Sequence, residues 1–270
     1  YYGNPNPLPV AGSQAAIQCL PTLLPRAMVA CLSPLYAEHP HAWQKAGHRP
    51  RFLQNALLPR ALAAATPYIL LCNPNNPTAE RHPRDIVLDT AQQLRKRGGW
   101  LIVDEAFIDA TPEESVTPLA GTAEAPNLIV FRSIGKFFGL AGARVGFLFA
   151  APDLLTRMAE ALGPWSVAGP AREAATLALQ DRHWQAETRS RLSAAGERLH
   201  TLLAPFGDVR STALFATLTT QHAAELHEHL AQAGILVRRF DQLPLLRFGL
   251  PGHDGAWQRL DSALTQWKTK

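Results

Sequence analysis

The sequence has few cysteines and lysines and no long apolar run. The scarcity of cysteine argues against a disulfide-rich protein, and the lack of a long apolar run argues against a membrane protein. Its three cysteines are widely spaced and odd in number. We therefore expect reduced, buried thiols in a cytoplasmic protein rather than disulfides or a zinc site. No apolar run approaches the roughly 18 residues that a membrane span needs, and no signal peptide is visible. These absences argue against membrane proteins and against small secreted disulfide-rich proteins.

The bulk composition is that of an ordinary globular protein. The 270 residues are 47% hydrophobic and 18% charged, and a chain of this length can bury a sizeable core. The net charge of +4 is modest and the basic residues are scattered, so we expect no nucleic-acid partner. The chain starts at Tyr1 and soon reaches a site-like Gly-Ser-Gln turn, which suggests that an N-terminal segment is absent.

Lysine is scarce, and one of the few lysines has an unusual setting. The chain has five lysines against 21 arginines. Lys136 lies in a glycine-rich turn directly after the apolar run 128–131, whereas the other four are in polar or terminal segments. Glycine and phenylalanine neighbours would partly desolvate its amine, and the nearby cation of Arg144 would also favour the neutral form. A neutral amine attacks aldehydes, so Lys136 is a candidate for covalent catalysis.

Alternating strands and helices predict a mainly parallel α/β sheet that is covered on both faces. Short apolar runs and helical spacing predict strands at 67–72, 100–103, 128–131 and 145–150, and helices at 12–24 and 84–97. A smaller α/β region should follow, with a helix at 171–203, strands at 212–219, 235–240 and 244–249, a helix at 222–232 and a last helix. We expect a large domain at 1–165 and an interdomain helix with a small domain at 166–270.

Three polar side chains follow the ends of three predicted strands. Asn76, Asp104 and Lys136 each come after the carboxyl end of a different apolar run. In open α/β sheets, ligands bind outside the carboxyl ends of the strands. The sequence therefore predicts that these three residues meet in one site.

The motifs around these residues resemble those of fold type I pyridoxal phosphate (PLP) enzymes. They are Asn-Pro-Asn-Asn-Pro-Thr at 73–78, Val-Asp-Glu-Ala-Phe at 103–107, and Ser-x-x-Lys at 133–136 with an arginine eight residues later. The resemblance covers nearly the whole chain. It is closest to the histidinol-phosphate aminotransferase-like branch of the class I/II aminotransferases and, within that, to threonine-phosphate decarboxylases of cobalamin biosynthesis. It implies a PLP-dependent transferase fold with a small C-terminal domain, a homodimer and bound PLP.

The resemblance also implies how the ring of the cofactor and the substrate are held. Lys136 would bind the aldehyde, and Asp104 would keep the ring nitrogen protonated so that the ring can accept electrons. Asn76 would donate to the phenolic oxygen and contact the substrate, and Tyr36 would stack on the ring. Arg247 would clamp the substrate carboxylate with its planar guanidinium.

The phosphate of the cofactor would be held by a separate set of donors. Ser133 and Arg144 match the phosphate-binding positions of the lysine motif. Backbone N–H groups of Gly12, Ser13 and Gln14 would add donors at the start of a helix, where the dipole favours an anion.

The sequence departs from the family pattern in three places. Phe107 stands where the aminotransferases usually have a tyrosine that donates to the phenolic oxygen. Ala79 replaces a glycine, and Gly135 replaces a serine or threonine before the lysine. The histidines at 227 and 229 lie on a polar helix face, so we predict no metal site.

The resemblance implies decarboxylation of O-phospho-L-threonine to (R)-1-amino-2-propanol O-phosphate. The residues alone leave decarboxylation and transamination open, because the pose of the substrate decides which bond breaks. A histidinol-phosphate-type aminotransferase is the alternative, and a non-catalytic PLP-fold binding protein is the alternative from another class.

Overall fold

The computed structural model describes residues 1–64 and 66–268, which form two compact units. The first unit comprises residues 1–76 and 80–182, and the second comprises 77–79 and the chain from His183 onwards. The division falls after residue 182 rather than after residue 165, where the sequence led us to expect it. Helix α6 (Gly169–Gln180) contacts the short helix η6 (Ala141–Ala143) and so groups with the first unit.

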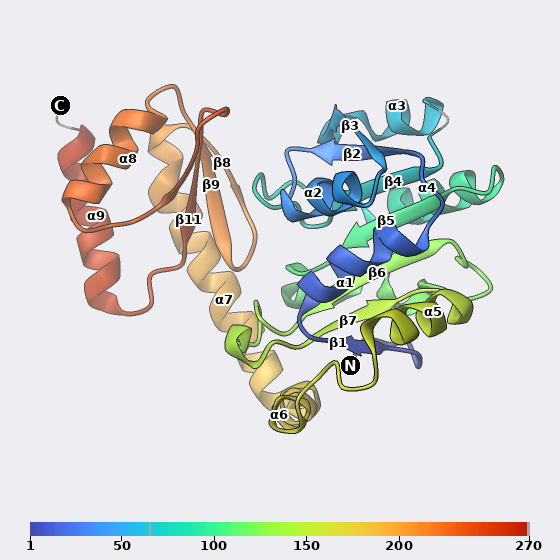
Figure 1. Cartoon of the computed structure of the whole chain (residues 1–270). Helices are drawn as coiled ribbons and strands as arrows, with labels where there is room; N and C mark the ends of the chain where they lie inside the picture. Colours follow the sequence, from blue (N-terminus) through green and yellow to red (C-terminus); the bar gives the residue numbers. More distant parts are fainter. Residues whose placement is uncertain (65, 269–270) are drawn as a thin grey trace. The chain divides into compact units, whose positions relative to one another are not determined.

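The first unit contains a sheet whose described residues form seven strands (Figure 1). In spatial order the strands are β1 (Leu8–Val10), β7 (Gly146–Phe149), β6 (Leu128–Ser133), β5 (Trp100–Asp104), β4 (Tyr68–Cys72), β2 (Met28–Ser33) and β3 (Arg49–Gln54). From β6 to β3 all neighbours are parallel, and β7 pairs antiparallel with both β6 and β1. The prediction of a mainly parallel sheet is confirmed.

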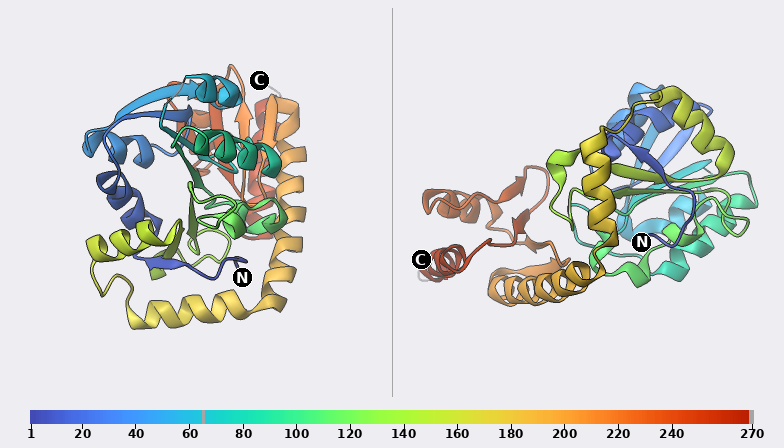
Figure 2. Two further views of the ribbon diagram at one scale, coloured as in Figure 1. Left: turned by 90° about the vertical axis from the view of Figure 1, so that its right-hand side faces the viewer. Right: turned by 90° about the horizontal axis from the view of Figure 1, so that it is seen from below.

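Helices cover both faces of this sheet, as Figures 1 and 2 show. One face carries α1 (Ser13–Cys19), η1 (Leu20–Leu23), α2 (Glu38–Lys45) and α5 (Pro152–Leu162), and the other carries α4 (Arg84–Arg95). Ile17, Trp43 and Met158 from the first group pack with strand residues such as Phe131, and all four are at most 1% exposed. The predicted helix at 12–24 forms in two parts, because Pro21 follows the last α-helical turn and the chain tightens there into η1.

Shorter elements complete the first unit. They are η2 (Asn55–Leu57), α3 (Leu58–Ala63), η3 (Ile108–Ala110), η4 (Pro112–Glu114) and η5 (Thr117–Leu119). The last three follow β5 and bring Glu105, Asp109, Ser115 and Thr117 around the fully buried Arg132 of β6. This network ties together the ends of the two strands on which the site is built.

The second unit is a smaller antiparallel sheet backed by helices. Its strand order is β10 (Arg238–Phe240), β11 (Leu245–Gly249), β9 (Phe215–Thr219) and β8 (Asp208–Ser211). The other elements are α7 (Arg182–Leu203), η7 (Ala204–Phe206), α8 (Ala223–Gln232) and α9 (Asp254–Lys268). Leu199, Leu226 and Leu264 of the helices form one core with Leu218 and Phe248 of the sheet.

Two sequence expectations in this region are wrong in detail. The helix expected at 171–203 is two helices, because the backbone leaves the helical conformation at Asp181 (φ −76°, ψ 79°). The strand expected at 212–219 begins only at Phe215, since the hydroxyl of Thr212 accepts from the N–H groups of Leu214 and Phe215 and bends the chain. None of the helices within residues 1–64 and 66–268 has the length and apolar character of a membrane span.

Candidate active site

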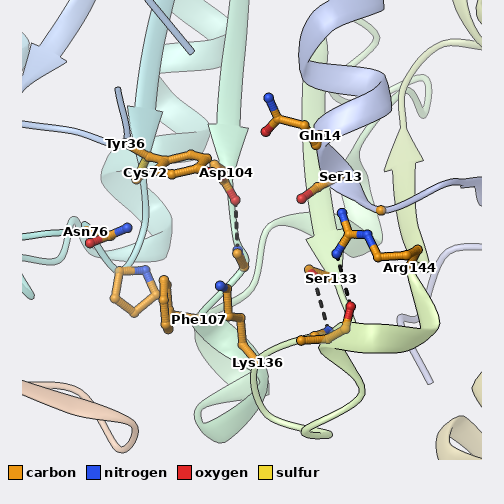
Figure 3. Close-up of a pocket in the computed structure, with 15 residues that line it drawn as sticks. Ser13, Gln14, Tyr36, Cys72, Asn76, Asp104, Phe107, Ser133, Lys136 and Arg144 are labelled. Carbon is orange, nitrogen blue, oxygen red and sulfur yellow. Dashed lines mark hydrogen bonds between the residues drawn. The ribbon is translucent and has the colours of Figure 1, made fainter. Parts of the chain in front are cut away.

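A pocket lies at the carboxyl ends of β4, β5 and β6 in the first unit. It is lined by residues that these strand ends and the start of α1 provide: Gly12, Ser13, Gln14, Tyr36, Cys72, Pro74, Asn76, Asp104, Ala106, Phe107, Ser133, Gly135, Lys136, Ala141 and Arg144. The structure therefore brings Asn76, Asp104 and Lys136 together, as expected from strand ends that meet at one sheet edge. Figure 3 shows Asn76, Phe107 and Lys136 on one side of the pocket and Ser13, Ser133 and Arg144 on the other.

Asp104 is the carboxylate of the pocket, and its two oxygens are engaged by the protein itself. It is the last residue of β5 and is only 6% exposed. Its Oδ1 accepts from the backbone N–H of Ala106 at 3.0 Å, and its Oδ2 lies 2.8 Å from Nε2 of His39. His39 is itself buried at 1% exposure and packs edge-on against Phe131. These contacts hold the carboxylate in one orientation, which a group that must bind a ring nitrogen needs.

Lys136 lies in the turn after β6. Its Nζ is 5.5 Å from the ring centroid of Phe107, within the range of a cation–π contact. Phe107 follows Asp104 by three residues, and its ring lines the same pocket. The amine is therefore held by an apolar ring at the side of the pocket where Asn76 also lies.

Arg144 and Gly12 form a cradle of donors at the other side. Gly12 has φ +72°, and a Cβ on it would lie 2.5 Å from Nη2 of Arg144, so only glycine lets the guanidinium come this close to the start of α1. Arg144 Nη1 donates to the carbonyl of Ala141 at 3.0 Å. Ser133 accepts from the N–H of Gly135 at 3.2 Å through its hydroxyl oxygen, which leaves the hydroxyl proton available as a donor.

Tyr36 and Cys72 line the remaining wall beside Asp104. Tyr36 is 39% exposed, and partial burial, followed by the carboxylates of Glu38 and Asp104, raises the pKa of its phenol. Burial and the neighbouring Asp104 raise the pKa of the Cys72 thiol well above its ordinary value. Both side chains are therefore neutral near pH 7, and Tyr36 presents an uncharged ring to the pocket.

Arg247, the expected substrate clamp, belongs to β11 in the second unit. It stands opposite Arg238 in the antiparallel pairing of β11 with β10. Burial and the charge of Arg238 lower the pKa of Arg247, but an arginine stays protonated at physiological pH. The guanidinium lies 5.5 Å from the ring centroid of Phe215. The sheet of the second unit thus presents two cations side by side.

Sequence reasoning missed His39 and Cys72. His39 stands three residues after Tyr36 and lies in the first turn of α2, which begins at Glu38. Cys72 is the last residue of a predicted buried strand and immediately precedes the asparagine-proline turn. Neither position could be linked to Asp104 from the sequence. The register of β4 with β5 places Cys72 beside Asp104, and the packing of α2 brings His39 to the same carboxylate.

The pocket can hold a ligand that has an anion at one end and a basic nitrogen at the other. Arg144, Ser133 and the start of α1 supply cationic and neutral donors, Asp104 supplies a fixed carboxylate, and Lys136 supplies an amine between them. Such a constellation serves covalent chemistry on an aldehyde.

Comparisons with known proteins agree with this geometry. The sequence profile of the family described as "Aminotransferase class I and II" matches residues 2–259. The threonine-phosphate decarboxylase of Pseudomonas aeruginosa is 48% identical over 270 residues, covering 99% of this chain and 80% of that protein. Two solved structures share the fold. The L-threonine-O-3-phosphate decarboxylase of Porphyromonas gingivalis has a TM-score of 0.80 at 23% identity (98% of this chain, 82% of that chain). The histidinol-phosphate aminotransferase of Sinorhizobium meliloti, solved with pyridoxal-5'-phosphate, has a TM-score of 0.82 at 22% identity, covering 97% of this chain and 76% of that chain.

Proposed function

We propose that this chain, which belongs to the aminotransferase class I and II family, is a PLP-dependent decarboxylase of O-phospho-L-threonine. The product would be (R)-1-amino-2-propanol O-phosphate, a building block of cobalamin. The single observation that carries the proposal is the pocket in which Lys136, Asp104 and Arg144 meet. The 48% identity to a threonine-phosphate decarboxylase over nearly the whole chain supports this substrate over others.

The residues of the pocket fit the cofactor. A dianionic phosphate needs cations and donors, which Arg144, Ser133 and the N–H groups at Gly12, Ser13 and Gln14 can give. The missing Cβ of Gly12 leaves the backbone open beside the Arg144 guanidinium. A pyridine nitrogen that is to stay protonated needs a fixed carboxylate, which Asp104 offers with His39 behind it.

When bound, PLP supplies an electron sink for the pair released as a bond at the substrate α-carbon breaks. Lys136 would hold the cofactor covalently through its aldehyde, and its amine would supply the proton that the substrate α-carbon takes when carbon dioxide leaves. Asp104 would keep the proton on the ring nitrogen. Asn76 would donate to the phenolic oxygen, and Tyr36 would cover one face of the ring.

The substrate would be gripped by the arginines of the second unit. Arg247 would bind the carboxylate through both of its terminal nitrogens. Arg238, which stands opposite Arg247 in the strand pairing, would provide a second cation for the substrate phosphate. Two neighbouring guanidiniums suit a substrate with two anionic groups, and they disfavour amino acids that have one.

The proposal includes a cytoplasmic homodimer. Cys19, Cys31 and Cys72 are all free thiols, as proteins of a reducing compartment have. Trp165 is 91% exposed in the segment between α5 and α6, beside a groove lined by Leu8, Leu162 and Val167. A large apolar side chain beside an apolar groove is typical of an interface between subunits.

The test is a product analysis with no keto acid present. PLP-loaded protein is incubated with O-phospho-L-threonine, and the products are identified by mass spectrometry, with Lys136→Ala as the control. We expect loss of carbon dioxide in the wild type and an unchanged substrate in the variant. Turnover only after 2-oxoglutarate is added would establish an aminotransferase instead, and bound cofactor without any turnover would establish a non-catalytic protein.

A further inference from the structure

Three side chains that can bind a metal ion meet behind the pocket. A ring nitrogen of His39, the sulfur of Cys72 and a carboxylate oxygen of Asp104 all lie within 4.8 Å of one another, and all three residues are buried. Among residues 1–64 and 66–268 this is the single cluster of histidine, cysteine and acidic side chains with such spacing. Nothing in the proposed function uses the sulfur.

The fold holds this cluster in place before any ligand arrives. Cys72 and Asp104 are the last residues of neighbouring parallel strands, and they are direct partners in the register of β4 and β5. Partners in register point to the same face of a sheet. His39 approaches that face from α2, with its ring packed against Phe131 and its Nε2 2.8 Å from Asp104.

The donor set selects one class of metal. An imidazole, a thiolate and a carboxylate are ligands of Zn²⁺ and Co²⁺, whereas Mg²⁺ and Ca²⁺ take oxygen ligands. One neutral and two anionic ligands also balance the charge of a divalent ion, which a buried site requires. Zinc bonds of about 2.0–2.3 Å place tetrahedral ligands roughly 3.3–3.8 Å apart. The ligand atoms lie within 4.8 Å of one another, so the longest of the three distances needs to close by about 1 Å. The 2.8 Å between His39 Nε2 and Asp104 Oδ2 needs to widen by about 0.5 Å, and small side-chain rotations provide both changes.

The site is also accessible from the pocket. Cys72 and Asp104 both line it, so an ion can enter there and a water molecule can fill the fourth position, as in three-ligand zinc sites. The thiol proton is released to solvent when the sulfur–metal bond forms. A divalent ion on Asp104 would cancel the negative charge that keeps a proton on a ring nitrogen, so the ion and a protonated ring compete for the carboxylate.

We propose that the cofactor-free chain binds one Zn²⁺ ion through His39, Cys72 and Asp104, and that this ion and the cofactor exclude each other. The exclusion rests on the function proposed above, in which Asp104 binds the ring nitrogen of the cofactor. The metal site itself does not depend on that function. Zinc would then act as an inhibitor of cofactor loading rather than as a part of catalysis.

The metal site is tested with Co²⁺, whose spectrum reports the ligands. The full chain is freed of cofactor and titrated with Co²⁺. We expect one equivalent to give a thiolate-to-cobalt charge-transfer band in the near ultraviolet, and Zn²⁺ to bleach it. Cys72→Ser should lose the band. Cys31→Ser, which changes another buried cysteine in the adjacent strand β2, is the matched control and should keep it.

Several results would overturn the site. They are a wild-type titration without a thiolate band, a band that survives in Cys72→Ser, and a band that disappears in Cys31→Ser. The wild-type spectrum decides the question even if Cys72→Ser does not fold, and circular dichroism checks the fold of each variant. Asp104→Asn should weaken Co²⁺ binding at least tenfold, because it removes one of the two anionic ligands.

The exclusion is tested by the rate of cofactor uptake with and without one equivalent of Zn²⁺, followed by the visible absorbance of bound PLP. We expect Zn²⁺ to slow uptake at least tenfold in the wild type and in Cys31→Ser, and not in Cys72→Ser. Equal uptake with and without zinc in the wild type would refute the exclusion. A chain that never takes up PLP would refute the proposed function instead, while the cobalt titration would still decide the metal site.

Discussion

Arg132→Met should destabilise the first unit far more than the same change at a surface arginine. The Arg132 side chain is 2% exposed, and the carboxylates of Glu105 and Asp109 that it bridges are fully buried. Its Nη1 lies 3.2 Å from Glu105 and its Nη2 2.5 Å from Asp109. Methionine fills a similar apolar volume but leaves both carboxylates without their cation.

The expected cost follows from this burial. Removing one partner of a buried ion pair costs about 3–5 kcal/mol, because a charge remains buried and uncompensated. Glu105 retains the N–H of Val116 at 2.7 Å and two hydroxyl donors, which argues for the lower half of that range. The matched control is Arg81→Met. The ion pair of Arg81 with Glu114 is 30% and 42% exposed, and such pairs contribute about 0–1 kcal/mol.

Hydrogen exchange measured by mass spectrometry on peptides from β5 and β6 provides the assay, since it reports the free energy of local opening. At about 1.4 kcal/mol per factor of ten, Arg132→Met should speed exchange of these strands by roughly two orders of magnitude or more. Arg81→Met should speed it less than about fivefold. Equal effects of the two variants would refute the assignment of an ionic network, as would an effect of Arg132→Met below tenfold. Affinity for PLP should also fall in Arg132→Met, since Asp104 and Ser133 adjoin the network.

Three further outcomes are expected. Borohydride treatment of PLP-loaded protein should fix the cofactor to the peptide that contains Lys136. Lys136→Ala should show no adduct and at least ~10²-fold less turnover. An adduct on another lysine would contradict the assignment of Lys136 as the cofactor-binding residue. Gly12→Ala should weaken PLP binding about tenfold in equilibrium dialysis, because φ is +72° and its Cβ would lie 2.5 Å from Arg144, whereas Gly142→Ala, with open space around its Cβ, should bind normally. Burial raises the pKa of Cys31 from 9.0 to about 12, so its proton is held more tightly in the folded state. Urea denaturation should therefore show stability lost between pH 9 and pH 12 in the wild type, with Cys31 contributing at most about 1.4 kcal/mol per pH unit. Cys31→Ala should lose less stability over this range than the wild type, and the loss that remains includes that of Cys72, whose pKa burial also raises.

The sequence predicted β4, β5, β6 and β7 from their apolar composition, but it missed β2 (Met28–Ser33), although that strand is also apolar and buried. Runs such as Tyr68–Cys72 and Leu101–Val103 are buried on both faces, and a parallel sheet with helices on both sides is the usual arrangement for such runs. The edge strand β3 was missed, since Arg-Pro-Arg-Phe-Leu-Gln has no apolar run and is largely exposed. The break between α6 and α7 was missed because Asp181 interrupts an otherwise helical composition at a single residue.

The residues of the site, like the strands, could be predicted only in part from the sequence. Asp104 and Lys136 could be assigned from the sequence because each ends or follows an apolar strand, and the rule of strand ends places them at one edge. The rule does not say which side chains of neighbouring strands point to the same face of the sheet. That Cys72 lies beside Asp104, and not one residue away on the opposite face, depends on the register of β4 against β5, and a slip of one residue would turn the sulfur into the other layer. His39 completes the cluster only because α2 packs on this face. The metal site we propose is therefore a property of strand register and helix packing, and the cobalt spectrum of Cys72→Ser tests that register as directly as it tests the chemistry.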